Sequence, residues 1–301
     1  MTGDTNKQTP THVAFSDESY YKVGRYRSIG LVTVAYGRLG KLASELTDIL
    51  EEARVRELKW QKLDANNDCQ AALKFVECAV SNACAANIRI DVLVWDTADS
   101  RHRVVGRDDM ANLQRMYYHL FKNVLIKRWP DGSIWRLHPD EQSGIDWSEI
   151  ARFLDAVSIP VSRRIPFSGF AESLRTEFNI GRIEQRKSEA EPLIQMADLF
   201  AGMGVYSRDR YEHFRCWLLN CRAERQALLL SEIASSVVLS NADKMRCPVL
   251  HKLHSLCKKG RLGVGFDESR GLHTHDPANP INFWLYEPQR EEDKAPVRER
   301  R

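Results

Sequence analysis

Four acidic residues far apart in the chain could together form a metal site for phosphate chemistry. They lie in four short segments, HVAFSDESYY (Asp17), RELKWQKL (Glu57), SIWRLHPDE (Asp140) and LIQMADLFAGMG (Asp198). Hard divalent cations take oxygen ligands, and magnesium is usually held by a few carboxylates together with water and substrate phosphate. Two such ions about 3.5–4 Å apart can activate water and stabilise the leaving oxygen of a phosphodiester. Convergence of the four acids in space would therefore indicate phosphodiester hydrolysis.

Asp198 is the most informative of the four, because it lies in the middle of an apolar stretch with helical spacing. A charged carboxylate in such surroundings is unfavourable unless it is paired or coordinates a metal. The small residues Ala197, Ala201 and Gly202 let another part of the backbone approach closely. A buried acid satisfied by an arginine or by a helix N-terminus is the structural alternative. Gln195, one turn earlier, either hydrogen-bonds a substrate or orients the acid.

The other three acids each have an ordinary structural interpretation as well. Asp17 marks the end of the first strand, where an acid can simply open a turn, and Glu57 follows a strong helix. Asp140 follows a strand and a proline, which is typical of a turn. Asp96, which ends IRIDVLVWD, competes with Asp140 for the same role.

The apolar spacing predicts the elements that must position these acids. Strands are expected at residues 13–15, 27–36, 88–96, in a segment ending at 137, at an edge in 159–167, and in 282–288. Helices are expected at residues 41–55, 68–86, 108–129, 146–156, 191–208, 210–221, 223–239 and near 248–259. Strands that alternate with helices predict an α/β protein whose mixed sheet is flanked by helices, with extra helices towards the C-terminus.

Composition limits the class of protein. The chain has 301 residues, of which 43% are apolar and 28% charged, as in an ordinary globular protein with a buried core. The formal net charge of +3 does not by itself indicate a nucleic-acid partner. We expect no membrane span, since no apolar run reaches the required length of about 18 residues. The polar start lacks a secretory signal, and seven cysteines without a CxxC pair favour reduced thiols in the cytoplasm.

The chain is expected to form one domain. Residues 1–10 are interpreted as a flexible N-terminus, and residues 11–287 as the domain, with helical additions at about 209–262. The charged, apolar-poor segment 288–301 is expected to be a disordered tail.

Three segments, in this order, resemble the DUF3800 family, a branch of the ribonuclease H-like superfamily: DES on the first strand, ELKW after the first long helix, and the late LIQMADLFAG. The resemblance spans roughly residues 12–205, and QMADLFAG with the preceding KSEAEPLI is its most specific part. It implies a ribonuclease H-like sheet and a cluster of acids that binds Mg²⁺ or Mn²⁺. Asp17, Glu57 and Asp198 would be three of these acids. Asp140 is chosen by its position after a strand.

Lys187 falls in a further segment of the resemblance, the stretch before the late helix. That stretch contains serine and lysine in the family, but here it reads IEQRKSEAE and lacks the preceding aspartate expected there. We expect Lys59, Gln195 and Lys187 to bind the substrate, with Lys59 steadying phosphate charge.

Taken together, the sequence predicts a divalent-metal-dependent nuclease with nucleic acid as its partner. The predicted catalytic and metal-binding residues are Asp17, Glu57, Asp140 and Asp198. A nucleic-acid-binding protein with the same fold but no cleavage is the alternative from another class. A hydrolase of small phosphoesters is a third possibility.

Overall fold

The computed structural model describes residues 9–19, 24–103, 105–106, 108–130, 132–141, 144–155, 180–225, 238–287 and 290. Within these ranges the strands are β1 (His12–Ser19), β2 (Tyr26–Ala35), β3 (Ile88–Asp96), β4 (Trp135–Pro139), β5 (Ile180–Ile183), β6 (Val264–Asp267), β7 (Gly271–Thr274) and β8 (Ile281–Leu285). The α-helices are α1 (Leu39–Ala53), α2 (Asn66–Cys84), α3 (Asp109–Val124), α4 (Trp147–Asp155), α5 (Pro192–Asp209), α6 (Tyr211–Arg225) and α7 (Asn241–Lys259). Short 3₁₀ turns are η1 (Tyr36–Arg38), η2 (Trp60–Lys62), η3 (Ser100–His102) and η4 (Ser188–Ala190).

In the described part of the chain, one sheet of six strands has the order β5-β4-β1-β2-β3-β8. Strands β1, β2 and β3 pair antiparallel, whereas β4 pairs parallel to β1, β5 parallel to β4, and β8 parallel to β3. Strands β6 and β7 form a separate antiparallel hairpin. The predicted fold class is confirmed: an α/β protein with a mixed sheet flanked by helices, and with extra helices towards the C-terminus.

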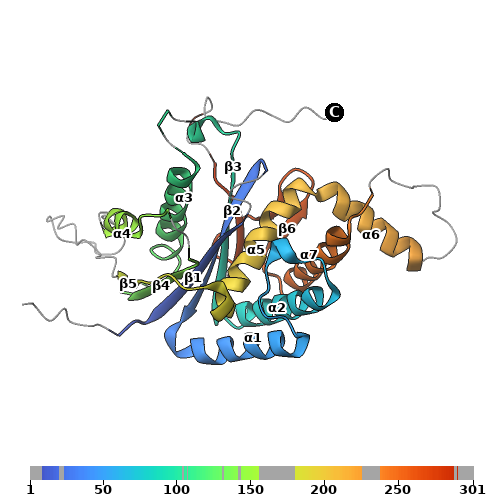
Figure 1. Cartoon of the computed structure of the whole chain (residues 1–301), viewed down its shortest axis with the longest axis horizontal. Helices are drawn as coiled ribbons and strands as arrows, with labels where there is room; N and C mark the ends of the chain where they lie inside the picture. Colours follow the sequence, from blue (N-terminus) through green and yellow to red (C-terminus); the bar gives the residue numbers. More distant parts are fainter. Residues whose placement is uncertain are drawn as a thin grey trace, which may run out of the picture.

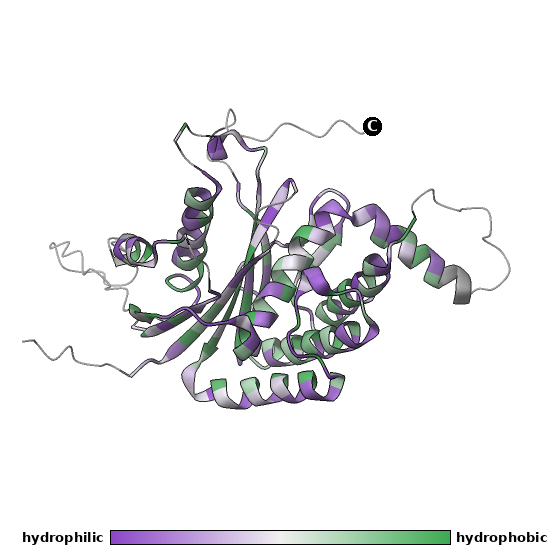
Figure 2. Cartoon of the chain, viewed as in Figure 1, coloured by the Kyte–Doolittle hydropathy of each residue, from purple (hydrophilic) through white to green (hydrophobic). Residues whose placement is uncertain are grey.

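Helices cover both faces of the sheet (Figure 1). Alternate residues of the strands point to opposite faces, so Phe15 packs in the core under α5, and Ala14 in the core under α3. Helices α1, α2, α5 and α7 lie on one side, and α3 and α4 on the other. Hydropathy follows this layering, since the strands at the centre of the molecule are largely apolar (Figure 2).

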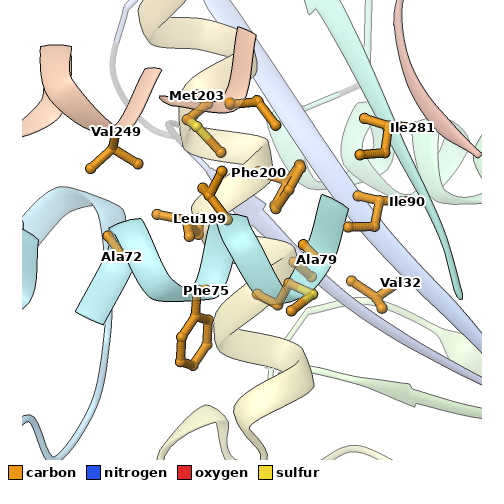
Figure 3. Close-up of a cluster of buried hydrophobic side chains, with 14 of the residues drawn as sticks. Val32, Ala72, Phe75, Ala79, Ile90, Leu199, Phe200, Met203, Val249 and Ile281 are labelled. Atoms are coloured by element: carbon orange, nitrogen blue, oxygen red, sulfur yellow. The ribbon is translucent and has the colours of Figure 1, made fainter. Parts of the chain in front are cut away.

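The larger core brings strands and helices from both halves of the chain together around α5. Figure 3 shows side chains from β2, α2, β3, α5, α7 and β8 that meet in one cluster, among them Val32, Phe75, Ile90 and Phe200. Helix α5 is buried on nearly all sides, from Pro192 to Ser207, which explains its continuously apolar sequence. Any polar side chain on α5 is therefore held in a defined place.

Two glycines let α5 approach its neighbours closely. A Cβ atom on Gly30 of β2 would lie 2.2 Å from the carbonyl oxygen of Ala197, and one on Gly202 would lie 2.1 Å from Cγ of Trp60. Gly30 is also the partner of Asp17 in the β1–β2 register. The close contact at Gly30 therefore brings α5 next to the strand position that carries Asp17.

Several sequence predictions need correction. The first strand was expected to end at Asp17, but β1 continues to Ser19 because the whole segment pairs with β2. The basic helix was expected to begin near Pro248, but α7 begins at Asn241, where Ser240 and Asp243 form a reciprocal capping box. Strand β5 and the β6–β7 hairpin were not predicted. The expected edge strand at 159–167, most of the helix expected at 223–239, and nearly all of the N-terminal segment and C-terminal tail lie outside the described residues. Residues 223–225 of that expected helix belong to α6.

Candidate functional site

The segment Glu57–Leu58–Lys59–Trp60 connects the acids that the sequence singled out. It lies between α1 and η2, so the backbone amides of Leu58 and Trp60 are not used within a helix. The amide of Leu58 donates to Oε1 of Gln195 at 2.8 Å, and the amide of Trp60 donates to Oδ2 of Asp198 at 2.6 Å. This segment is thereby attached to α5 at two points one helical turn apart.

Lys59 lies between two acids from neighbouring parallel strands. Its Nζ donates to Oδ2 of Asp17 at 2.7 Å and to Oδ2 of Asp140 at 3.3 Å. Asp140 follows β4 directly, and its amide donates to the carbonyl of Ser16 at 2.8 Å, which extends the β1–β4 ladder. The parallel pairing thus places Asp140 beside Asp17, as parallel strands place their carboxyl ends at one edge.

Asp198 faces this pair from α5 and is only 4% exposed. Burial raises the pKa of Asp198 to about 6, against the attraction of Lys59 and the hydrogen bond from Trp60. Burial and then the charge of Asp198 raise the pKa of Asp17 well above its usual range, although Lys59 opposes this. The site therefore holds more negative charge than Lys59 compensates.

Glu57 joins the same network through Ser188. Ser188 Oγ donates to Oε1 of Glu57 at 2.6 Å, and the Ser188 amide donates to Oδ1 of Asp140 at 3.0 Å. Burial alone would raise the pKa of Glu57, but hydrogen bonds from Ser188 and Lys62 outweigh it and lower the pKa. Glu57 is thus a hydrogen-bonded anion at the rim of the site.

Gln195 contacts the protein's own backbone on both sides. Besides accepting from Leu58, its Nε2 donates to the carbonyl oxygen of Ser188 at 2.7 Å, and its side chain is fully buried. These contacts fix the ELKW segment relative to η4. The two roles that the sequence left open for Gln195, binding a substrate or orienting Asp198, stay predictions.

The structure separates the two candidates for the third acid. Asp96 ends β3 but is held by Arg25, with Nη2 to Oδ2 at 2.6 Å, and among the described residues it forms no ion pair with Lys59. Asp140, in contrast, shares Lys59 with Asp17. Lys187 is exposed and immediately precedes Ser188, so its backbone lies next to the site.

Sequence reasoning noticed Ser188 but gave it no role. A sequence signal for it exists, because KSEAEPLI combines a serine with a proline at the first turn of the following helix. Glu18 was also missed: it accepts from the hydroxyl of Tyr117 at 2.8 Å, on the α3 side of the sheet. The charge of Glu18 contributes to the raised pKa of both Asp17 and Asp198.

The donor chemistry of the site fits a hard divalent cation. Carboxylate oxygens from β1, the residue after β4 and α5 surround a positive charge, the ammonium group of Lys59. Among the residues that the structure describes, no three His, Cys, Asp or Glu side chains already stand together so as to hold a metal ion. The Lys59 ammonium occupies the position between Asp17 and Asp140 that an ion bound to both would need.

Two proteins of Methanothermobacter thermautotrophicus are similar to this chain over nearly its whole length. Uncharacterized protein ORF2′ is 41% identical over 292 residues, covering 94% of this chain and 97% of that protein. Uncharacterized protein ORF2 is 39% identical over the same length, with the same coverage. The chain therefore belongs to the family of these two proteins. No family model matches the chain, so the DUF3800 assignment stays a prediction.

Two solved structures resemble the chain at low identity. One is the PCNA:RNase HII complex from Archaeoglobus fulgidus, with a TM-score of 0.35, 15% identity, and coverage of 74% of this chain and 81% of that chain. The other is Bst-RNase HIII in complex with Mn²⁺, with a TM-score of 0.34, 14% identity, and coverage of 84% and 72%. These TM-scores are low, so neither structure is evidence for a substrate or a metal of this chain. None of the helices in the described part of the chain is long and apolar enough to cross a membrane.

Proposed function

We propose that this protein is a divalent-metal-dependent nuclease, a hydrolase that cuts nucleic-acid phosphodiesters, of the DUF3800 kind. The observation that supports this most directly is the position of Lys59, whose ammonium group lies between Asp17 and Asp140 beside the buried Asp198. Asp17, Glu57, Asp140 and Asp198 would hold Mg²⁺ or Mn²⁺. When bound, the ions would supply Lewis-acid chemistry, activating water and stabilising the leaving oxygen of the phosphodiester.

The chain's own residues provide positioning. Asp17 lies on a central strand and Asp198 on a buried helix, so neither carboxylate needs to be ordered when a ligand arrives. Displaced from Asp17 and Asp140, Lys59 would keep its positive charge next to the phosphate, because the negative charge of the phosphate favours the protonated ammonium group. Gln195 and Ser188 act as positioning residues for the ELKW segment. Lys187, which is exposed, would contact the phosphate backbone without reading sequence.

One observation favours a rival function. Lys59 already neutralises part of the acidic charge without any metal, as it would in a purely structural ion-pair network. In that case the protein would bind nucleic acid in the cytoplasm without cleaving it. The proposed nuclease would work in the same compartment.

Cleavage assays with Mn²⁺ distinguish the two. Single-stranded DNA, double-stranded DNA, RNA and an RNA–DNA hybrid are incubated with the wild type, with Asp198→Asn and with the exposed-acid control Asp64→Asn. The nuclease proposal expects cleavage of at least one substrate by the wild type and by Asp64→Asn, and a loss of about 10³-fold or more in Asp198→Asn. Binding without cleavage by all three proteins contradicts it and favours the rival. A model diester tests for a small-phosphoester hydrolase.

A further inference from the structure

A second polar region lies at the open edge of the sheet, away from the ELKW segment. It is a cavity of about 430 Å³ beside the edge strand β8. Hairpin strand β7, the C-terminal end of α3 and the C-terminal end of α5 complete its walls. None of the acids or positioning residues described above lines it.

The lining is strongly basic. It contains three arginines, Arg128, Arg208 and Arg270, and two histidines, His273 and His275, against one carboxylate, that of Glu287. Arg270 is paired with Asp267, with Nη2 to Oδ2 at 2.6 Å. Arg128 and Arg208 form no ion pair within the described part of the chain. Carboxylates attract both groups only from a longer distance, Asp267 and Asp96 in the case of Arg208, and Asp91 and Asp276 in the case of Arg128.

The same side chains leave hydrogen-bond donors unused. The Nε atoms of Arg128 and Arg208 and the Nε1 atom of Trp284 are buried, and none has a hydrogen-bond partner among the described residues. All three residues line the cavity. A buried N–H without an acceptor destabilises a protein by about 1–3 kcal/mol, and the residues that carry these three donors all belong to the lining of one cavity.

Burial also affects the charge of the two arginines. Burial lowers the pKa of Arg208, and of Arg128, relative to an exposed guanidinium, because the charged form loses hydration. Gly271, with a φ of +61°, has no side chain where a Cβ would lie 2.7 Å from Cγ of Arg208. The hairpin can therefore lie directly over this arginine and hold it at the cavity wall.

We propose that this cavity binds the phosphate group of a nucleotide or of a nucleic-acid strand. Phosphate carries negative charge and several acceptor oxygens, and guanidinium groups bind it through paired, charge-assisted hydrogen bonds. Arg128 and Arg208 are the phosphate-binding residues, with Arg270 at the outer rim.

The cavity is distinct from the site at Asp17. Residues Asp17, Gly30, Val92 and Phe283 form one row across the sheet, and Phe283 lines the cavity. Three steps between strands of about 4.8 Å each place the backbone of Phe283 about 14 Å from that of Asp17. One phosphate cannot reach both, so the inference does not depend on metal chemistry at Asp17.

Binding measured by calorimetry in the presence of EDTA tests the proposal. The probes are inorganic phosphate, AMP, adenosine, and a short single-stranded DNA with and without a 5′-phosphate. The variants are Arg128→Gln, Arg208→Gln and, on the exposed hairpin, Arg270→Gln. Arg215→Gln on α6 serves as the matched control, since its side chain is 58% exposed and outside the cavity. Thermal unfolding verifies that each variant folds.

The expected result is that at least one phosphate-bearing probe binds, and that its unphosphorylated counterpart binds at least tenfold more weakly. Each variant at Arg128 or Arg208 that folds should weaken that binding by about tenfold or more, and Arg270→Gln should weaken it less. Tighter binding of AMP identifies a free nucleotide as the source of the phosphate, and tighter binding of the phosphorylated DNA identifies a strand. Absence of binding, equal binding of phosphorylated and unphosphorylated probes, or equal loss in Arg215→Gln overturns the proposal.

Discussion

The backbone amide of Trp60 donates a 2.6 Å hydrogen bond to Asp198, while the neighbouring residue Lys59 donates to Asp17 at 2.7 Å. Two consecutive residues therefore hold an acid of the first strand and an acid of the late helix in one network. The carbonyl of Trp60 in turn accepts from Arg246 of α7 at 3.0 Å. The C-terminal helices thus help to fix the segment on which the candidate site depends.

The raised pKa of Asp198 gives a pH-dependent stability. Its value of about 6 in the folded protein exceeds the ordinary 3.8, so the folded protein binds this proton more tightly than the unfolded chain. At pH values below both pKa values, the Asp198 carboxyl group does not lower the unfolding free energy. Between the two pKa values its destabilising effect grows with pH, and above the pKa of the folded protein the effect is complete. That penalty is about 3 kcal/mol at neutral pH.

Asp198→Asn should remove this penalty and can keep the hydrogen bond from Trp60. The unfolding free energy of the variant, relative to wild type, should therefore rise by about 3 kcal/mol between about pH 4 and pH 7 without metal. Urea unfolding at several pH values measures this difference. A difference that stays constant over this range would show that Asp198 is not held in an unfavourable charged state.

Lys59→Met should make the site bind a divalent cation more tightly. The substitution keeps the length of the side chain but removes the charge that lies between Asp17 and Asp140. Calorimetric titration with Mn²⁺ should give affinity higher by about tenfold or more, because the ion no longer meets a like charge. Lys74→Met on α2 removes a lysine paired with Glu52 and should leave the affinity unchanged. Weaker binding in Lys59→Met would mean that Lys59 supports the ion instead of competing with it.

Gly30→Ala should prevent α5 from packing on the sheet. The new Cβ would lie 2.2 Å from the Ala197 carbonyl oxygen, which belongs to the backbone and cannot rotate away. We expect a loss of about 3 kcal/mol or more in chemical unfolding. Gly40→Ala in α1 is the control: nothing lies within 4 Å of its Cβ, and alanine favours a helix. Similar effects of the two substitutions would contradict the role of Gly30.

Ser188→Ala should change the ionisation of Glu57. The lost hydroxyl donates to Oε1 of Glu57, whereas the Ser188 amide that binds Asp140 remains. The pKa of Glu57 should rise, and stability should fall by about 1 kcal/mol. A carboxyl-carbon NMR titration measures the first effect and thermal unfolding the second. Ser188→Thr, which keeps a hydroxyl, should restore the low pKa, and failure to do so with an intact fold would weaken this assignment.

Much of the fold was predictable because its central elements have strong periodicity. Strand β3 was predicted with its exact bounds, since all nine of its residues are buried and bounded by turns. The short strands β5 and β6 escaped prediction because four residues give no clear alternation. Helix α7 was predicted seven residues too short, because the prediction began at Pro248, which lies inside the helix.

The candidate site was harder to predict than the fold. An ionisable side chain in an apolar helix is unusual, so Asp198 could be singled out from the sequence. Its hydrogen bond with Trp60 involves a backbone amide, and such a bond has no sequence signature. The choice between Asp140 and Asp96 required the strand order, because each follows or ends a strand. Only the parallel pairing of β4 with β1 places Asp140 next to Asp17.

The central claim is that Asp17 and Asp198 hold a divalent cation, and a crystal soaked in Mn²⁺ tests it most directly. Anomalous scattering locates manganese independently of the protein density. We expect a peak bonded to carboxylate oxygens of Asp17 and Asp198, with Lys59 turned away from Asp17 and the peak absent in Asp198→Asn. Manganese bound only elsewhere, with the Lys59–Asp17 ion pair intact, would contradict the proposed function.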